Sequence, residues 1–412
     1  MIYINLKRYI YFFSFCIVNK HIMKKTEKKS HINKKKYTYL IQQEFLEEKD
    51  SVTNTKKIDR FKQEFKKRGN WIEFNLKGPS KHIDFLYIDG KYMVDKSLYK
   101  YSKTLTSRVD MATDNHSISD KYKLLENLKK TNIDPKHLLD QCLVNLYDLY
   151  SEKDLSSYLE TNYKKLFDKY KVMIFKPIHG VKGQDMKTFD DFDKFKNFTI
   201  KMITKMTPKL NTINIEEYSK LGIETRYRTY NIEWVLQEYV IDVLLYNDRK
   251  FHMRTFFVYH KPNKRSKKGF LLDNMWSFTA KEPYVKSDFG NKDIHDTHFK
   301  NSVVGIDFKH NITNLIGKEN SVHVMNQIIH IFKNVFKIIN APCYQESNQC
   351  FQIFGCDLMI TADLTVKIIE ANYMPGSPNI SMIDNIMSDI VDPIFKPQNK
   401  TPNTSPNKFI KL

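Results

Sequence analysis

The sequence predicts a mixed protein of the α+β or α/β class, in which a small N-terminal α/β domain precedes two β-rich lobes. Its 412 residues are 41% hydrophobic and 13% aromatic. That is enough apolar mass for about two or three domains with sizeable cores, and too much for wholesale disorder. Strand and helix patterns alternate up to about residue 115, and from Lys171 onward strands predominate with short helices between them.

We expect residues 1–36 to be a basic, disordered leader. The apolar run Tyr9–Val18 is too short to cross a bilayer, and the lysine-rich stretch at 24–36 is typical of a solvated tail. The alternative is a targeting signal, against which no small-residue cleavage site follows the run. Met23 is a second candidate start.

Residues 37–115 form the predicted N-terminal α/β domain. Ile58, Phe61 and Phe65 recur at helical spacing, which predicts a helix over Ile58–Arg68. The predicted strands are Tyr37–Ile41, Trp71–Phe74 and His82–Ile88, the last followed by an Asp89-Gly90 turn.

Residues 116–240 form the predicted central lobe. A helix over Lys121–Lys130 begins after Ser119 or Asp120, either of which suits an N-cap. We expect residues 137–170 to be mostly helical, because leucines form an apolar stripe there. The stripe consists of Leu138, Leu139, Leu143, Leu146 and Leu149. Beyond it we expect strands at Lys171–Pro177 and Trp234–Val240, with a helix at Phe192–Ile203.

Residues 241–396 form the predicted C-terminal lobe, and 397–412 a polar tail. The expected strands are Lys250–Tyr259 and Leu271–Thr279, separated by a basic loop at Lys261–Lys268. A helix is expected at Ser321–Asn340, followed by a terminal hairpin.

This terminal hairpin joins Gln352–Ile360 to Val366–Asn372. If the turn has two residues, Asp357 lies opposite Glu370, and Asn372 follows on the same face. Two carboxylates at a Cβ separation of about 5 Å repel by roughly 3 kcal/mol at an effective dielectric of about 20. Two carboxylates and an amide oxygen suit Mg²⁺. The alternative is a half-exposed hairpin whose acids are solvated.

Two upstream strands carry cationic side chains. Lys176 shares an apolar strand face and precedes a loop with Gly180 and Gly183, which would let backbone N–H groups approach phosphate oxygens. Lys250, His252 and Arg254 alternate onto one face of a later strand, which would suit an anion groove. In both cases the alternative is an ordinary solvated lysine or strand face.

Two other segments carry weaker signals. The strand Trp234–Val240 turns polar at Gln237 and Glu238, so it could offer backbone groups and an apolar wall to an adenine ring, or be an ordinary edge strand. His295 and His298 are three residues apart with no third ligand nearby, which argues against zinc.

The charge and the cysteines constrain partners and compartment. A net charge of +20 predicts an acidic partner, which could be nucleic acid, an anionic membrane or an acidic protein segment. Five cysteines without a CxxC motif predict reduced cytosolic thiols rather than a zinc ribbon or a disulfide framework.

The order of these segments resembles the nucleotide site of ATP-grasp enzymes. Their residues resemble the tubulin–tyrosine ligase family, and its tyrosine-adding members more than its polyglutamylases, from about Tyr37 to Leu412. The segments that carry the resemblance are Asp120–Leu124, Phe175–Gly183, Gln237–Tyr239, Arg249–Arg254, Lys281–Tyr284, His295–His298, Phe354–Asp357, Glu370–Asn372 and Phe409–Leu412.

The resemblance implies an ATP-grasp fold in which ATP lies between two β-rich lobes. The implied nucleotide contacts are Lys121, Lys176, Gly180, Val181, Lys182 and Gly183 at the phosphates, Gln237, Glu238 and Tyr239 at the adenine, and also Lys250 and Thr297. The implied catalytic residues are Lys250, Arg254 and Glu370. Asp357, Glu370 and Asn372 would hold one or two Mg²⁺ ions, with K⁺ as a further candidate cation.

The implied reaction is ATP-dependent addition of an amino acid, most simply tyrosine, to the C-terminal carboxylate of α-tubulin through an acyl phosphate. The implied partners are the acidic α-tubulin tail and a free amino acid, with no nucleic acid and no membrane. We expect a cytoplasmic, cytoskeleton-associated monomer. The alternatives are a ligase that adds glutamate or glycine, and a catalytically weak ATP-grasp module that binds tubulin.

Three positions depart from the family pattern. His252 stands where the family has Asp in the basic strand, His298 where it has Asn, and Phe278 where it has an Arg before the Glu-Pro-Tyr segment. Loss of a cation beside the transferred phosphate could cost on the order of 3 kcal/mol in the transition state. These departures therefore put catalysis in more doubt than ATP binding.

Overall fold

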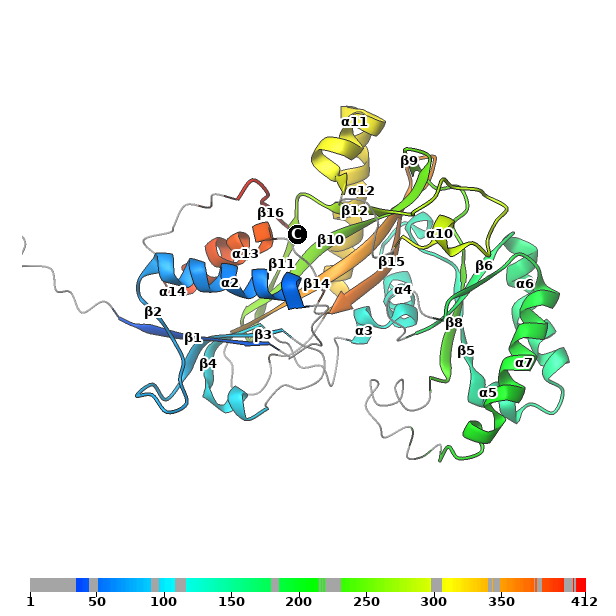
Figure 1. Cartoon of the computed structure of the whole chain (residues 1–412), viewed down its shortest axis with the longest axis horizontal. Helices are drawn as coiled ribbons and strands as arrows, with labels where there is room; N and C mark the ends of the chain where they lie inside the picture. The colour runs from blue at the N-terminus through cyan, green and yellow to red at the C-terminus, as the bar shows by residue number, and fades with distance from the viewer. Residues whose placement is uncertain are drawn as a thin grey trace, which may run out of the picture.

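The computed structural model describes most of the chain from Lys35 to Leu412. The described residues are 35–43, 51–89, 96–107, 116–178, 185–214, 216, 218, 231–297, 306–339, 343, 349–373, 375, 380–395, 403 and 405–412. Two β-sheets organise them, a large mixed sheet and a small antiparallel one (Figure 1).

In the described part of the chain the large sheet has twelve strands, and its main path runs β13-β12-β10-β14-β4-β3-β1-β2. These are β13 (Ile306–Asp307), β12 (Trp276–Thr279), β10 (Arg249–Asn263), β14 (Gln349–Ile360), β4 (Ser102–Thr106), β3 (Ile83–Asp89), β1 (Tyr37–Gln43) and β2 (Trp71–Glu73). Off this path, β9 (Leu245–Tyr246) and β11 (Ser266–Leu272) pair with β10, β15 (Val366–Tyr373) pairs with β14, and β16 (Phe409–Lys411) pairs with β11.

The N-terminal strands and their helix are confirmed. β1 pairs in parallel with both β2 and β3, and α2 (Ser51–Arg68) packs on them through the fully buried Phe61 and Phe65. β4 then pairs in parallel with the first residues of β14. The N-terminal strands and the C-terminal hairpin therefore belong to one continuous sheet.

The small sheet has the order β5-β8-β6-β7. Its strands are β5 (Gln141–Asn145), β8 (Glu233–Glu238), β6 (Met173–Pro177) and β7 (Lys187–Phe189). The helices α5 (Leu146–Ser151), α6 (Leu155–Lys169) and α7 (Phe192–Leu210) pack against it, at the right of Figure 1.

The prediction of a mostly helical 137–170 segment is wrong for its first part. Gln141–Asn145 is a strand, because all five residues pair with β8. Leu138, Leu139, Leu146 and Leu149 are buried as expected, but Leu143 is 39% exposed. A leucine pattern that fits one helical face also fits a strand followed by a helix, and pairing with β8 decides between them.

The basic segment at 261–268 is also not a loop. β10 continues to Asn263 and β11 begins at Ser266, so the segment is the tip of a hairpin. The predicted strand Leu271–Thr279 is two strands, β11 and β12, which pair with successive parts of the same edge of β10, opposite β14. β10 is this long because β14 pairs with it as far as Lys261.

The remaining helices cover the large sheet and line its junction with the small one. The long helices agree with the prediction in position, α12 at Lys318–Ile338 and α4 at Lys121–Lys129 with Asp120 as its N-cap. The shorter ones are η2 (Lys96–Tyr101), α3 (His116–Ser119), η3 (Pro135–His137), α10 (Lys292–His295), η4 (Phe308–Ile312), α11 (Thr313–Ile316), α13 (Ile380–Ile386), η5 (Met387–Val391) and α14 (Asp392–Phe395). In the described part of the chain, no helix is both long and apolar enough to span a membrane.

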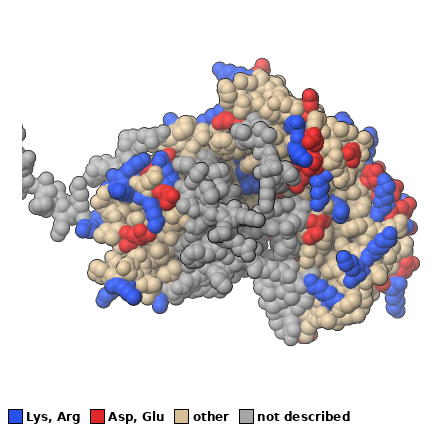
Figure 2. Space-filling view, in the orientation of Figure 1, with Lys and Arg blue, Asp and Glu red and all other residues tan. Residues whose placement is uncertain are grey.

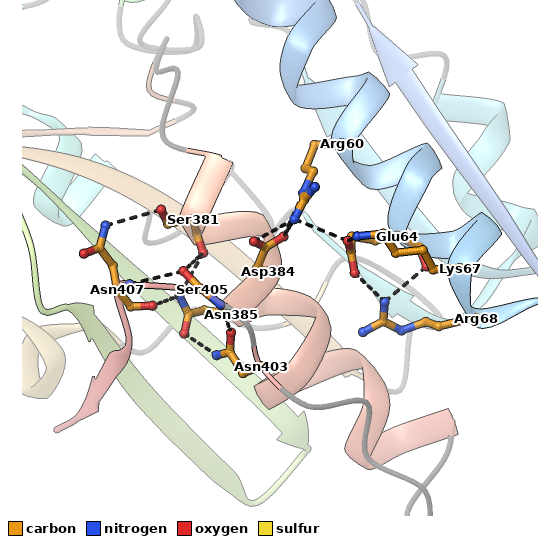
Figure 3. Close-up of polar contacts among 10 residues, drawn as sticks. All are labelled: Arg60, Glu64, Lys67, Arg68, Ser381, Asp384, Asn385, Asn403, Ser405 and Asn407. Carbon is orange, nitrogen blue, oxygen red and sulfur yellow. Dashed lines mark hydrogen bonds and ion pairs between the residues drawn. The ribbon is translucent and has the colours of Figure 1, made fainter.

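Ion pairs connect α2 to the C-terminal helices (Figure 3). Arg60 donates to both carboxylate oxygens of Asp384 at 2.8 and 2.9 Å, and Arg68 donates to Asp392 twice at 2.7 Å. Asn385, which is fully buried, donates to the Asn407 carbonyl at 2.8 Å and accepts from Asn403 at 2.9 Å. The last residues of the chain are thereby fixed against α13.

The expectation that all cysteines are reduced is wrong for one pair. Cys343 and Cys350 form a disulfide, with their Cα atoms 5.5 Å apart. Cys350 is the second residue of β14, and Cys343 lies between the end of α12 and that strand, seven positions earlier. Cys142 and Cys356 are free thiols, as predicted.

Candidate functional site

The β14–β15 hairpin places two carboxylates opposite each other. Asp357 pairs with Glu370 and Gly355 with Asn372, which confirms the predicted pairing. The predicted two-residue turn is wrong: Thr361 N donates to Thr365 O at 2.9 Å, and Leu364 at φ +66° closes a three-residue loop. The three-residue loop alone would move the pairing by one position. A register shift between Asp357 and Leu358 adds one residue to β15 and brings Asp357 back opposite Glu370.

Each carboxylate already has cationic or amide neighbours. Asp357, 2% exposed, accepts hydrogen bonds from Arg254 Nε and, at 2.8 Å, from the terminal guanidinium nitrogen. Glu370 accepts from Asn372 Nδ2 at 2.7 Å and lies 3.7 Å from Lys121 Nζ. Burial alone would lower the pKa of Arg254, but the Asp357 carboxylate outweighs it and raises that pKa. The guanidinium is therefore always charged.

Lys176 contributes a cation from the small sheet. It is buried on β6 at 4% exposure, and its Nζ donates to Gln237 Oε1 at 2.9 Å. Burial lowers the pKa of Lys176 to about 8. The negative charge of Glu370 acts to raise this pKa, and the positive charge of Lys121 acts to lower it further. Because Glu370 and Lys121 act on it electrostatically, the lysine faces the carboxylates of the large sheet. The candidate site therefore lies where the two sheets meet.

A buried amide on β5 completes this side of the site, and the sequence analysis missed it. Gln237 Nε2 donates to Gln141 Oε1 at 3.0 Å, and Gln141 Nε2 donates to the Tyr122 carbonyl at 2.7 Å. Gln141 was hidden by the wrong helix prediction. A strand prediction would have placed it on one face of a strand, but its position beside Gln237 depends on the pairing with β8.

Lys250 begins a second chain of contacts. Its Nζ donates to Tyr239 Oη at 2.6 Å, and the tyrosine lies 2.6 Å from His295 Nδ1. His295 Nε2 lies 2.8 Å from the Asp288 carbonyl, so it carries the proton and Nδ1 accepts from Tyr239. Burial lowers the pKa of Lys250 to about 7 and raises that of Tyr239. Burial and then Lys250 lower the pKa of His295.

His252, which departs from the family pattern, contacts Phe278, Thr297 and Asp357. Its Nδ1 lies 2.6 Å from Thr297 Oγ1, and its Nε2 lies 3.8 Å from Asp357 Oδ1. Its ring stacks on Phe278 with a centroid separation of 5.3 Å. His252, Phe278 and Thr297 therefore form one cluster beside Asp357.

Some predicted site residues do not join these contacts. The Glu238 carboxylate binds Lys367 Nζ at 3.3 Å and the Asp140 amide at 3.2 Å, so its side chain does not join the Lys176 contacts. The residues Gly180, Val181, Lys182, Gly183 and His298 lie outside the described part of the chain.

The donor set at the hairpin fits a hard cation. Asp357, Glu370 and Asn372 offer only oxygen ligands, as Mg²⁺ prefers, and a carboxylate bound by one guanidinium keeps further lone pairs. Among the described residues, no group of three or more His, Cys, Asp or Glu side chains could hold a metal. A metal ion at this site would therefore take its ligands from the two carboxylates, from Asn372 and from a bound substrate.

Comparison with known proteins decides the family. The model of the tubulin–tyrosine ligase family matches residues 103–404, which include every site residue described above. The chain belongs to this family. Among its relatives, a probable tubulin–tyrosine ligase of Schizosaccharomyces pombe is 23% identical over 284 residues, covering 64% of this chain and 66% of the relative. A probable tubulin–tyrosine ligase of Saccharomyces cerevisiae, PBY1, is 26% identical over 208 residues, covering 43% of this chain and 27% of the relative.

A solved structure establishes the fold of this family member. The C-terminal domain of K. lactis Pby1, an ATP-grasp enzyme that interacts with the mRNA decapping enzyme Dcp2, superimposes with a TM-score of 0.60. The match has 16% sequence identity and covers 91% of this chain and 98% of that domain. The fold is therefore ATP-grasp, as predicted. The chain spans less than two thirds of the length of the two curated relatives.

Proposed function

We propose that this chain is an ATP-dependent carboxylate–amine ligase that adds an amino acid, most simply tyrosine, to the C-terminal carboxylate of an acidic protein tail such as that of α-tubulin. One observation carries the proposal. Two buried lysines, Lys176 and Lys250, and the largely covered Arg254 supply this side of the site with cations. The charges of Glu370 and Asp357 act on Lys176, Arg254 binds Asp357, and Lys250 shares a face of β10 with Arg254 by strand alternation. Buried cations require anions, and a triphosphate would supply them.

The proposed reaction has two steps. A carboxylate oxygen of the acceptor attacks the γ-phosphorus of ATP, ADP leaves, and an acyl phosphate forms. The amino acid's amine nitrogen then attacks the acyl carbon, the C–O bond to phosphate breaks, and the amine proton passes to solvent. Bound Mg²⁺ would neutralise phosphate charge, with Asp357, Glu370 and Asn372 as its ligands.

The chain's own residues would contribute mainly positioning and charge. Lys176 and Lys121 would hold phosphate oxygens, and Arg254, fixed by Asp357, would face the transferred group. The hinge at Gln237, Glu238 and Tyr239 would hold the adenine, chiefly through its backbone because the Gln237 amide is already bonded twice. Thr297 and the loop at residues 180–183 would complete the nucleotide contacts.

The acceptor proposal rests on charge. The net charge of +20 complements an acidic tail, although lysines and arginines are interspersed with acids on the face shown in Figure 2. Such attraction is screened over about 8 Å at physiological salt, so acceptor binding should weaken as salt rises. A tubulin acceptor would place the protein in the cytoplasm, on microtubules.

A catalytically weak ATP-grasp module that docks an acidic partner is the second candidate. Its support is the His252–Phe278 ring stack, which puts an aromatic group where the family resemblance leads one to expect an arginine. A ligase that adds glutamate or glycine is a third reading of the same site.

One assay distinguishes these proposals. Detyrosinated tubulin is incubated with the protein, Mg-ATP and labelled Tyr, Glu or Gly, and incorporation is measured by mass spectrometry of the α-tubulin tail. We expect tyrosine incorporation that is lost in Glu370→Gln and kept in Glu152→Gln, an exposed carboxylate on the small lobe. Incorporation of Glu or Gly alone would select the third reading. Binding of ATP without incorporation of any amino acid would sink the enzyme proposal in favour of the docking module.

A further inference from the structure

A chain of buried amides connects the two lysines that face Glu370. It begins at Lys176 on β6, passes through Gln237 on β8 and Gln141 on β5, and ends at the carbonyl of Tyr122. Tyr122 follows Lys121 in the first turn of α4, where the Asp120 cap fixes the backbone by accepting from Tyr122 N and Lys123 N at 2.9 Å. Four elements are thus connected by side chains that are each at most 9% exposed.

The chemistry of its two ends fixes the direction of this chain. An ammonium can only donate hydrogen bonds, so Gln237 must present its oxygen to Lys176 and its NH₂ to Gln141. Gln141 must then present its oxygen to Gln237, which leaves its NH₂ for Tyr122. A carbonyl can only accept, so the last contact agrees with the first. Glu126 Oε1, 3.4 Å from the same nitrogen, is a second acceptor and favours the same orientation.

This series of hydrogen-bonded amides determines which group accepts a hydrogen bond from Lys176. The Gln237 oxygen accepts a hydrogen bond from its ammonium at 2.9 Å, and Glu370 is the carboxylate whose charge acts most strongly on it. If Gln141 were absent, the Gln237 amide could rotate and present its NH₂ to the lysine. Lys176 would then turn to Glu370 and form an internal ion pair, which would use up both the cation and the carboxylate.

We propose that Gln141 is a positioning residue for phosphate recognition: by fixing the amide of Gln237, it keeps Lys176 available to the phosphates of a nucleotide and connects it to the turn that carries Lys121. This inference rests on the proposed ATP site. It goes beyond that proposal because it assigns a role to a residue on β5 that touches neither nucleotide nor metal in it.

The test compares two ligands by calorimetry, Mg-ATP and adenosine, which lacks phosphates. Gln141→Met keeps the side-chain length but removes the three hydrogen bonds of its amide, to Gln237, Tyr122 and Glu126. We expect it to weaken Mg-ATP binding about tenfold, the effect of losing about one buried hydrogen bond, while adenosine affinity changes less than about twofold. A residue that merely supports the fold would change both affinities together.

A double-mutant cycle tests whether Gln141 acts through Gln237. Gln237→Met should weaken Mg-ATP binding to a similar extent, and the double variant should be no weaker than the more severe single one. Asn334→Leu is the matched control, because Asn334 is a buried amide on α12 that is hydrogen-bonded to His330 and Lys337. It should lower the unfolding temperature without changing either affinity.

The outcomes separate this inference from the proposed function. If the wild-type protein binds no Mg-ATP, the proposed function falls and the inference falls with it. If the wild type binds Mg-ATP but Gln141→Met loses neither ligand, or loses both equally, only the inference is overturned. Gln141→Ala, which removes the same amide without occupying its space, is the second variant should the methionine disturb folding, and it must show the same selective loss.

Discussion

Asp357 and Glu370 lie directly opposite each other on β14 and β15, but they differ in their partners. Asp357 is bound by Arg254 through two hydrogen bonds, whereas Glu370 has a neutral amide and a lysine 3.7 Å away. The Arg254–Asp357 pair is therefore the fixed half of the site. Glu370 is the half whose charge is left to be satisfied by a ligand.

The first prediction concerns the fixed pair. Arg254→Met leaves the Asp357 carboxylate buried without its arginine, which typically costs about 3–5 kcal/mol. We expect the free energy of unfolding, measured with urea in the absence of nucleotide, to fall by about that amount. Arg254→Met combined with Asp357→Asn should recover much of the loss, because it removes the unpaired charge.

The control for this pair is an exposed one. Lys281 binds Asp293 at 2.7 Å, with side chains 46% and 37% exposed, and Lys281→Met should cost less than about 1 kcal/mol. Equal losses for Lys281→Met and Arg254→Met would contradict the buried character of the site pair.

The second prediction is a dependence of stability on pH. Burial lowers the pKa of Lys250 to about 7, against about 10.4 in an unfolded chain. Between these values the unfolded chain binds more protons, so this lysine makes stability rise with pH. Below pH 7 both states are protonated, and the full cost of burying the charge is present.

Lys250→Met removes this cost but also the hydrogen bond to Tyr239. The variant should be more stable than wild type at pH 6–7 by about 1–3 kcal/mol, and the advantage should shrink as the pH approaches 10. Urea titrations of both proteins from pH 6 to 10 measure the difference, with Lys201→Met, an exposed lysine, as the control. A constant difference across that range would show that Lys250 does not titrate there.

The third prediction compares two arginines on one helix. Arg68 and its partner Asp392 are each 2% exposed, while Arg60 and Asp384 are 23% and 13% exposed (Figure 3). Both form two hydrogen bonds with a carboxylate on the C-terminal helices. Arg68→Met should therefore cost about 3 kcal/mol or more and Arg60→Met about 1 kcal/mol, measured by urea unfolding. The reverse order would mean that burial does not decide the strength of these contacts.

The pairing of the hairpin could be predicted from the sequence because the alternation of side chains along a strand is a local property. Asp357 and Glu370 could be paired from spacing alone, although a three-residue loop and a bulge compensate each other to give the same register. The helix of residues 121–129 was also predictable, since Asp120 caps it through its own chain neighbours.

What could not be predicted depends on partners that are distant in the sequence. Gln141 is a strand residue only because β8, almost a hundred positions away, pairs with it. The Arg254–Asp357 contact depends in the same way on the pairing of β10 with β14. Neither of these partners has a local signal.

The fourth prediction explains the glycine of the Phe354–Asp357 segment. A Cβ at Gly355 would lie 2.5 Å from Pro375 Cβ and 3.2 Å from Arg254 Cδ. The first distance is closer than real carbon atoms approach, so the proline must shift. The second presses on the arginine that binds Asp357. Gly355→Ala should therefore destabilise the fold by about 1–3 kcal/mol through overpacking, and it should also weaken nucleotide binding by displacing Arg254.

Gly290 provides the matched control, because a Cβ there meets nothing within 4 Å. Gly290→Ala should leave the unfolding temperature and Mg-ATP affinity close to wild type.

If Gly355→Ala is as well tolerated as Gly290→Ala, then Pro375 does not pack against Gly355 of β14. If Gly355→Ala is destabilised but binds Mg-ATP normally, the proline shifts without moving Arg254, and the close packing at Gly355 supports the sheet rather than the site. Loss of both properties is the expected result, since Arg254 pairs with Asp357 across β10 and β14 and its side chain lies against Gly355.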